Sequence, residues 1–312
     1  MNEQVQSIND CIELEDGIRL VYQEPEEYIR YYSIYYGQKY ADYFFRRSSA
    51  AMKDIVSIFD CGYVIMKDEN IVGGVFLKPN FLADLFVVPP YDDYKGLVTK
   101  LLNYLKKVSK TEEEIYFRDI VEEHVPAYKQ HGCQVREVNY WMIRPTQPMK
   151  AMLPEGYSSK AVSREDTNDI ACLIMKSYKA NSAYKQVGTK EDYMNHVEEF
   201  IDKYQKNKIM DECSRVIVDK STNNIVGVCL HMEFEDYPLI MSLAVDPEHQ
   251  HKGLGRFLLS HSINISSEEY PATRLAVLKD NPAIQLYEDL GFIRNRSVVD
   301  MYVGCLNKND GS

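Results

Sequence analysis

Hydrophobic and polar positions along the C-terminal half of the chain predict an alternation of strands and helices. Apolar stretches bounded by turn residues predict strands over residues 156–162, 214–220, 224–235, 238–245, 273–278 and 297–306. Helical patterns predict helices after Ser163, over about 190–206, from the glycines near 253 to about 266, and from Asn281 to Gly291. The expected order of elements is therefore β-α-α-β-β-β-α-β-α-β.

The helix expected after residue 253 begins in an unusual way, with the sequence HQHKGLGRFLL at 249–259. A later helix of the same half starts with an ordinary signal, the capping residue Asn281 followed by Pro282. At the unusual start, Gly253 and Gly255 leave the backbone free of side chains. This pattern predicts that the helix start itself contacts a ligand.

The chain carries an internal repeat, which predicts two copies of one domain. Three pairs of segments match in the same order: VIMKDENIVGGVFL (64–77) with VIVDKSTNNIVGVCL (216–230), VVPPYDDYKGLVTKLL (87–102) with AVDPEHQHKGLGRFLL (244–259), and AYKQHGC (127–133) with LYEDLGF (286–292). Within them, the matched positions are Gly73 and Gly227, Gly96 and Gly253, and Tyr128 and Tyr287. Prolines interrupt any regular element over 144–157, so we predict domains at 1–148 and 149–312.

Composition changes this picture little but disfavours several classes of protein. A net charge of −11 offers no basic platform for nucleic acid, and no apolar run approaches the roughly 20 residues of a membrane helix. Seven scattered cysteines without a CxxC motif favour free thiols in a reducing compartment, and no metal-ligand pattern occurs. The acidic, polar N-terminus is unlike a secretory signal. We therefore expect a cytoplasmic protein, monomeric or homodimeric, without a metal, a nucleic-acid partner or a membrane partner.

Together with the order of elements, two motifs make the C-terminal half resemble the GCN5-related N-acetyltransferase (GNAT) family. The family's helix-start signature, Q/R-x-x-G-x-G/A, is matched in full by residues 250–255, and its preceding V-x-P by residues 245–247. A later pattern of the family is matched by Asn281, Tyr287 and the Gly-Phe pair at 291–292. The resemblance implies two tandem domains of mixed α/β (α+β) class, each with a mostly antiparallel central sheet flanked by helices.

The resemblance also implies an acetyl-CoA site around the glycine loop. Unpaired N–H groups and the positive end of the helix dipole form an anion site that suits the pyrophosphate of coenzyme A. The expected cofactor-binding residues are Leu243, Ala244 and Val245 at the strand end, Gln250, His251, Lys252, Gly253, Leu254, Gly255 and Arg256 at the helix start, and Asn281 and Tyr287 downstream.

In this family an amine attacks the acetyl thioester directly. By resemblance, the backbone N–H of Leu243 or Val245 would stabilise the oxyanion, Asn281 would contact the pantetheine arm, and Tyr287 would protonate the departing thiolate. Packing beneath the sheet is the alternative role for Tyr287.

The general base is the least defined part of the expected site. Many family members place a Glu about four residues before the oxyanion donor, where this chain has Leu239. We take Glu233 as the base, with Glu235 and Asp236 as alternatives that could also be ordinary strand-end charges. A base is dispensable if the amine arrives neutral.

The N-terminal copy departs from the pattern where the cofactor would lie. Asp93 and Val98 occupy the positions that Gln250 and Gly255 occupy in the C-terminal copy. The acidic side chain of Asp93 would repel a pyrophosphate. We therefore read this copy as degenerate. Its tyrosine-rich segment at 26–45 has helical spacing, which favours a core helix; the wall of an acceptor pocket is the alternative.

The sequence thus predicts an N-acetyltransferase that transfers an acetyl group from acetyl-CoA to a primary amine of a small molecule or peptide. The alternative is a non-catalytic protein that binds or senses acyl-CoA, because no base is secure.

Overall fold

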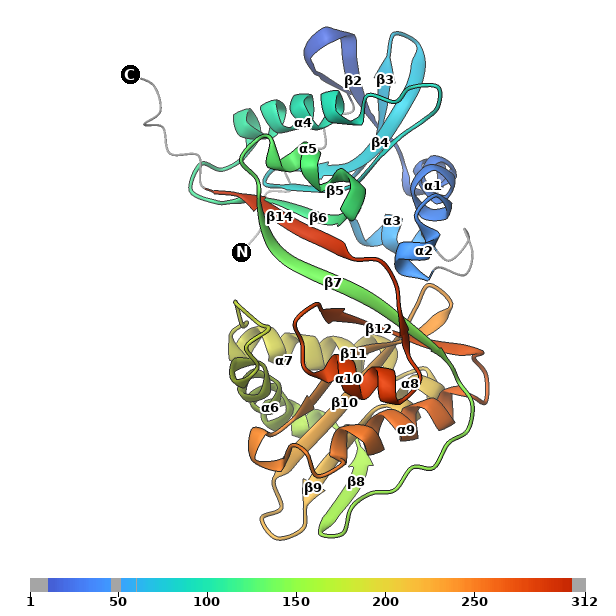
Figure 1. The fold of residues 1–312 in the computed structure, drawn as a ribbon, viewed down its shortest axis with the longest axis vertical. Helices are drawn as coiled ribbons and strands as arrows, with labels where there is room; N and C mark the ends of the chain where they lie inside the picture. The colour runs from blue at the N-terminus through green and yellow to red at the C-terminus, as the bar shows by residue number, and fades with distance from the viewer. Residues whose placement is uncertain (1–10, 46–51, 60, 305–312) are drawn as a thin grey trace. The chain divides into compact units, whose positions relative to one another are not determined.

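The computed structural model describes residues 11–45, 52–59 and 61–304. Contacts divide the chain into two compact units, one comprising residues up to 139 together with those from 296 onward, and the other residues 140–295. Each unit is a mixed α/β body with its own hydrophobic core and its own part of a strand order that is continuous through β7 (Figure 1). No helix among the described residues combines the length and the apolar character needed to cross a membrane.

The N-terminal unit has an almost wholly antiparallel sheet with one parallel pair, β5 with β6. Its strands are β1 (Cys11–Glu13), β2 (Ile18–Tyr22), β3 (Gly62–Lys67), β4 (Asn70–Lys78), β5 (Phe81–Val87), β6 (Ile115–Val121), the first half of β7 (Gln134–Pro145) and β14 (Val298–Val303). Its α-helices are α1 (Pro25–Tyr32), α2 (Ala41–Phe44), α3 (Lys53–Phe59), α4 (Tyr94–Val108) and α5 (Val125–Lys129).

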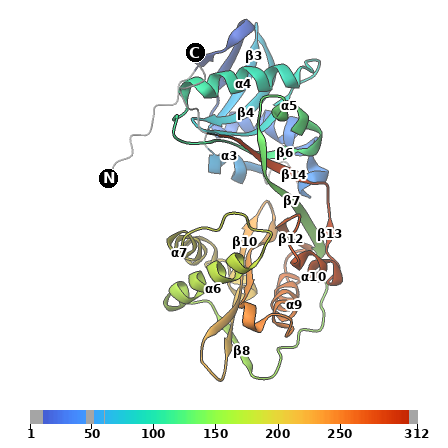
Figure 2. The same ribbon diagram turned by 60° about the vertical axis from the view of Figure 1, so that its left-hand side comes forward.

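The C-terminal unit has the same plan, with β11 and β12 as its parallel pair. Its strands are β8 (Tyr157–Ala161), β9 (Arg215–Asp219), β10 (Ile225–Phe234), β11 (Tyr237–Val245), β12 (Ala272–Leu278), β13 (Ile293–Arg294) and the second half of β7. Its α-helices are α6 (Thr167–Ala180), α7 (Lys190–Glu199), α8 (Lys208–Cys213), α9 (Leu254–Ser266) and α10 (Ala283–Asp289). Helices α6 and α7 cover one face of the sheet, and α9 and α10 cover the other (Figure 2).

Helix packing in the C-terminal unit follows from the apolar spacing of the sequence. On α6, Ile170, Leu173 and Ile174 are buried at the i, i+3, i+4 spacing of one helix face. The helical stretch that leads into α6 starts as predicted, because Ser163 and Asp166 form a capping box. Apolar side chains therefore lie on both faces of the central strands.

The internal repeat predicted from the sequence is confirmed by equivalent strand pairing, although the register is one position off the sequence match, which aligns Val87 with Ala244. Gly73 of β4 pairs with Val87 of β5, and Gly227 of β10 pairs with Val245 of β11. In each unit the long helix that follows, α4 or α9, leads to the parallel strand, and a shorter helix comes next.

The two halves of the chain exchange strands. In the N-terminal unit β14 lies between β6 and β7, pairing antiparallel with both. In the C-terminal unit β7 lies between β12 and β13. The sequence prediction missed this exchange, since it gave each half its own last strand. The division into repeats at 148/149 stays a prediction, whereas the compact units assign residues from 296 onward to the N-terminal unit.

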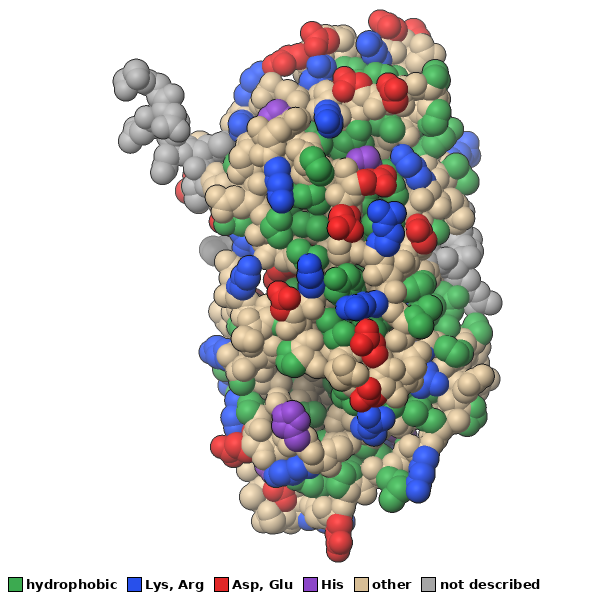
Figure 3. Space-filling view, viewed as in Figure 1, with side chains coloured by type: hydrophobic (Ala, Val, Ile, Leu, Met, Phe, Trp, Pro, Cys, Tyr) green, Lys and Arg blue, Asp and Glu red, His purple; other side chains and the backbone are tan. Residues whose placement is uncertain are grey.

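Most elements predicted for the C-terminal half are present in the described residues, with α8 and the two-residue β13 in addition. The last two residues of the strand predicted at 297–306 lie outside the described residues. In the tyrosine-rich segment, Tyr28, Tyr32 and Tyr36 are buried and their rings contact one another in series, so this segment forms core. Over the face drawn in Figure 3, acidic and basic side chains are interspersed.

Candidate functional site

The parallel strands β11 and β12 separate toward the end of β11. They pair at Leu239 with Arg274 and at Ile240 with Leu275, although β11 continues to Val245. The N–H of Asp246 bonds to Val226 on the β10 side, at 2.9 Å. Because backbone groups alternate in direction along a strand, the N–H groups of Val245 and Leu243 face the opening.

The side chain of Gln250 supports this orientation. Its amide nitrogen donates to the carbonyl oxygen of Val245 at 3.1 Å, so the polar groups of Val245 do point away from β10. Gln250 belongs to the glycine loop, and this bond ties the loop to the strand end. The sequence signature thus has a structural reason at its first position.

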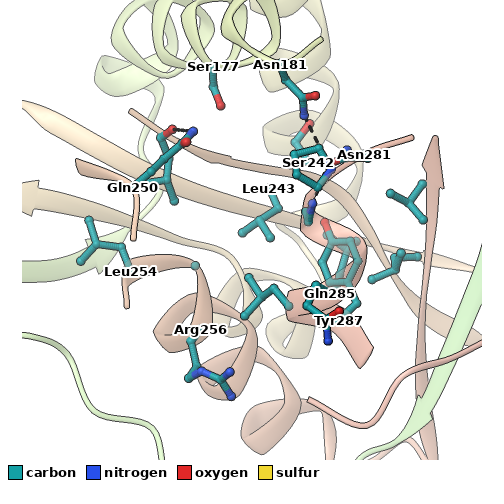
Figure 4. A pocket seen from close by; sticks show the side chains of 18 of the residues that line it. Ser177, Asn181, Ser242, Leu243, Gln250, Leu254, Arg256, Asn281, Gln285 and Tyr287 are labelled. Carbon is teal, nitrogen blue, oxygen red and sulfur yellow. Dashed lines mark hydrogen bonds between the residues drawn. The ribbon is translucent and has the colours of Figure 1, made fainter. Parts of the chain in front are cut away.

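A cavity of about 640 Å³ opens at this separation of strands and lies wholly within the C-terminal unit (Figure 4). It is lined by residues from α6, β11, the glycine loop, the start of α9, β12 and α10. The predicted cofactor residues among its lining are Leu243, Val245, Gln250, His251, Gly253, Leu254, Gly255, Arg256, Asn281 and Tyr287.

Two predicted cofactor residues do not line the cavity. Ala244 is buried and packs in the cluster of α6 and β10 side chains, because neighbouring strand residues point to opposite faces. Lys252 is exposed in the loop and lies outside the lining.

The three candidate bases also lie outside the cavity lining. The carboxylate of Glu233 accepts a hydrogen bond from the Asn207 side chain at 2.9 Å. Glu235 is 1% exposed and forms an ion pair with the fully buried Arg274, at 3.1 Å. Asp236 follows in the tight turn between β10 and β11 with φ of 63°. The structure therefore brings the expected donor groups together, while it leaves Glu233 apart from them.

The start of α9 forms one wall of the cavity. Gly253 occupies the N-cap with φ of 86°, a left-handed conformation that favours glycine, and no side chain caps the first turn. A Cβ at Gly255 would lie 3.3 Å from Leu286, tighter than ordinary contact. The helix thus presents its first N–H groups and its positive dipole end to the cavity, which suits a phosphate.

Three tyrosines gather in the cavity. Tyr178 and Tyr184 stack with ring centroids 4.3 Å apart. Tyr287 on α10 is 7% exposed, and burial raises the pKa of its phenol well above the usual range. Burial likewise raises the pKa of Tyr178 and Tyr184, so all three are protonated at neutral pH and can donate hydrogen bonds.

Polar side chains continue along the opposite wall. Asn181 donates to Asn281 at 3.2 Å, and Asn281 also accepts from the N–H of Ala283, which caps the start of α10 (Figure 4). Oγ of Ser242 on β11 lies 3.0 Å from Nε2 of His196 on α7. Burial lowers the pKa of His196, so its imidazole is neutral at neutral pH.

Sequence reasoning missed the residues of α6, α7 and the loop between them. Ser177 is a polar residue on the buried, otherwise apolar face of α6, and Asn181 directly follows the helix, so their polarity could have drawn attention to them. Tyr184 lies in an irregular segment and His196 reaches Ser242 across 46 residues of sequence, so neither has a local signature.

The N-terminal unit is built differently at the equivalent place. The carboxylate of Asp93 accepts from the N–H of Gly96 at 2.8 Å and caps α4. The rings of Tyr94 and His124 stack at 3.7 Å, and burial lowers the pKa of His124 to about 4. A hollow of about 220 Å³ remains there, about a third of the cavity in the other unit.

Comparison with known proteins supports the resemblance to the GNAT family. Residues 212–294 match the model of the acetyltransferase (GNAT) domain. Among solved structures, a GCN5-related N-acetyltransferase from Sphaerobacter thermophilus is 17% identical, with a TM-score of 0.70 over 93% of this chain and 96% of that chain. A tandem GNAT protein from the clavulanic acid biosynthesis pathway is 14% identical, with a TM-score of 0.60 over 93% and 98%.

A third structure contains a GCN5-related glucosamine N-acetyltransferase region within a fungal multi-domain β-N-acetylglucosaminidase. It is 11% identical to this chain, with a TM-score of 0.58 over 92% of this chain and 38% of that one. At these identities the likenesses concern the fold. Comparison with curated protein sequences gave no significant match.

Proposed function

From the premise that the chain has the tandem GNAT fold and carries a GNAT acetyltransferase domain over residues 212–294, we propose that it is an N-acetyltransferase. The donor is acetyl-CoA, whose thioester supplies an activated acetyl group, and the acceptor is a primary amine of a small molecule or peptide. The C-terminal unit contains the site, and the N-terminal copy is degenerate.

One observation carries this proposal. An uncapped helix start and a separated pair of parallel strands line the same cavity of about 640 Å³. The helix start suits the pyrophosphate of coenzyme A, and the free strand edge suits an extended polar chain and a developing oxyanion. Either feature alone has an ordinary structural explanation, whereas their convergence is what a thioester-dependent transferase needs.

Each residue of the proposed site has a separate role in binding or catalysis. The N–H groups at Gly253 and Gly255, aided by Arg256, hold the phosphates. Asn281 orients the pantetheine arm, and the N–H of Leu243 or Val245 stabilises the oxyanion. Tyr287 donates a proton to the thiolate, which its raised pKa permits throughout the neutral range. Glu233 stays a predicted base, which its position outside the cavity does not favour.

Calorimetry and a transfer assay test the proposal. We expect acetyl-CoA to bind at one site per chain, and thiol release to accelerate with at least one amine of a panel comprising propylamine, glucosamine, a lysine peptide and a peptide with a free N-terminus. Two equivalent binding sites would contradict the degeneracy of the N-terminal copy.

Tight binding without transfer to any amine would instead favour the alternative function, a protein that binds or senses acyl-CoA. Absence of binding would remove both functions.

A further inference from the structure

Ser242 and His196 are a hydrogen-bonded pair of polar side chains, and neither belongs to the proposed acetyl-CoA site, oxyanion donors, general acid or general base. Ser242 is on β11, directly before Leu243, and lines the cavity (Figure 4). His196 is on α7, half-buried behind it, with Nε2 at 3.0 Å from the serine Oγ. A serine inside the cavity is thus hydrogen-bonded to an imidazole that lies outside the lining.

We propose, on the premise of the acetyltransferase activity above, that Ser242 and His196 form the proton relay that deprotonates the acceptor amine. Ser242 contacts the amine, and His196 acts through Ser242.

The position of Ser242 favours this role. Leu243 and Val245 present their N–H groups to the strand opening, and Ser242 is the neighbour of Leu243 in sequence, with its side chain toward the α6 and α7 face. A group that accepts the amine proton must lie close to the carbon that the amine attacks. Ser242 lines the cavity directly before Leu243, whose N–H is a proposed oxyanion donor, whereas Glu233 bonds to Asn207 outside the cavity lining.

The transfer balances without any additional reactant. The amine nitrogen bonds to the acetyl carbon and the bond from that carbon to sulfur breaks. The ammonium proton passes to Ser242 Oγ as the hydroxyl proton passes to Nε2 of His196, giving an imidazolium. Tyr287 protonates the thiolate. Solvent then returns His196 and Tyr287 to their starting states, so one proton has moved in net from the amine to the thiol.

The surroundings of His196 keep it ready to accept. Burial is the main influence and lowers its pKa, while Glu199 on the same helix acts in the opposite direction. On the neighbouring α6, Tyr178 hydrogen-bonds to Ser242, and burial keeps this phenol protonated. Ser242 itself carries no charge. His196 is therefore neutral at neutral pH, as a base must be.

The test compares Ser242→Ala, His196→Gln and the double variant in the amine assay, across pH and with saturating substrates. Each single change should lower kcat about 10²- to 10⁴-fold, with the calorimetric affinity for acetyl-CoA unchanged. The double variant should lose no more than one single variant, because the two residues act as a unit. In the wild type, kcat should rise with pH at pH values below 6.5, the ordinary pKa of an imidazole, because burial lowers the pKa of His196. This rise should disappear in His196→Gln.

Matched substitutions away from the cavity give the controls. Ser260→Ala removes a buried hydroxyl of α9 that has no hydrogen-bond partner among the described residues, and His261→Gln changes a histidine bound to the Glu212 carbonyl. Both should retain wild-type kcat.

Several outcomes would overturn the relay. Wild-type kcat and pH dependence in both single variants would do so, as would a loss seen with Glu233→Gln but not with His196→Gln. Additive losses in the double variant would show that the two residues act separately. If the wild type binds acetyl-CoA but acetylates no amine of the panel, the proposed function fails and the relay fails with it; an active wild type with insensitive variants defeats the relay alone.

Discussion

The helices α4 and α9 are equivalent elements of the two repeats, but their first turns are completed in opposite ways, and α4 begins three residues earlier relative to the matched Gly96 and Gly253. In α4 the carboxylate of Asp93 bonds to the N–H of Gly96, so the chain supplies its own anion. In α9, Gly253 is the N-cap and no side chain fills that role. The same repeat therefore yields a helix start capped by its own carboxylate in one unit and a helix start without a side-chain cap in the other.

The contrast extends to the tyrosines that follow. Tyr128 is 1% exposed and its hydroxyl lies 3.3 Å from that of Tyr94, inside the core of the N-terminal unit. Tyr287 lines a cavity. A tyrosine retained in both repeats therefore lies in a closed core in one unit and beside an open cavity in the other.

The largest expected difference between the two copies concerns catalysis. Tyr287→Phe should lower kcat about 10²- to 10⁴-fold with little change in KM for acetyl-CoA, because a general acid acts on the leaving group alone. Tyr128→Phe, the matched change, should leave kcat unchanged. Steady-state kinetics of both variants measure this.

The pH profile adds a second criterion. Since burial raises the pKa of Tyr287 above its ordinary value of 10, the phenol stays protonated and kcat should not fall up to about pH 10. Equal kcat in Tyr287→Phe and the wild type would reduce Tyr287 to packing.

The next effect concerns affinity. Gly253→Asp would give α9 a carboxylate at its N-cap, as Asp93 gives α4, and it should weaken acetyl-CoA binding by about 100-fold or more, through repulsion and loss of space at the phosphates. Calorimetry measures this loss.

Gly291→Asp is the matched control, because Gly291 has a similar φ of 84° but lies outside the cavity lining. It imposes the same backbone strain and should leave the affinity unchanged. Equal losses in both variants would attribute the effect to strain rather than to the phosphate site.

The smallest effect concerns stability. Asp93→Ala should lower the free energy of unfolding by about 1 kcal/mol, the usual value of a lost helix cap, while Asp93→Asn should preserve most of it. Urea unfolding of both variants measures this difference. Neither change should create a second acetyl-CoA site, since the stacked rings of Tyr94 and His124 remain in place. A second site in Asp93→Ala would mean that the carboxylate alone closes the N-terminal copy.

The glycine-loop side of the cavity could be predicted from the sequence because its signals are local. Gly253, Gly255 and Gln250 lie within six consecutive residues, and their spacing alone requires a tight turn into a helix. Residues joined only by tertiary packing gave no such signal. His196 meets Ser242 because α7 packs over β11, and Glu235 resembles an exposed strand-end charge although Arg274 buries it in an ion pair.

The strand exchange could not be predicted for a related reason. Val298, Val299 and Met301 are buried in β14. A strand with apolar residues of this kind could, however, pair with the edge of any sheet that has a buried face. The pattern therefore predicts a strand without specifying its partners. The partner strands, β6 and β7, come from the other half of the sequence.

The place of β14 also sets an order of events on the ribosome. β6 and β7 are synthesised early, but the strand that separates them is complete only at residue 303. At about 5–20 residues per second, the roughly 150 residues in between take about 8–30 s, during which both strands have an unmatched edge. The half of the protein that is made first is therefore finished last, and a ribosome that stalls before residue 298 leaves that gap open to strands of other nascent chains.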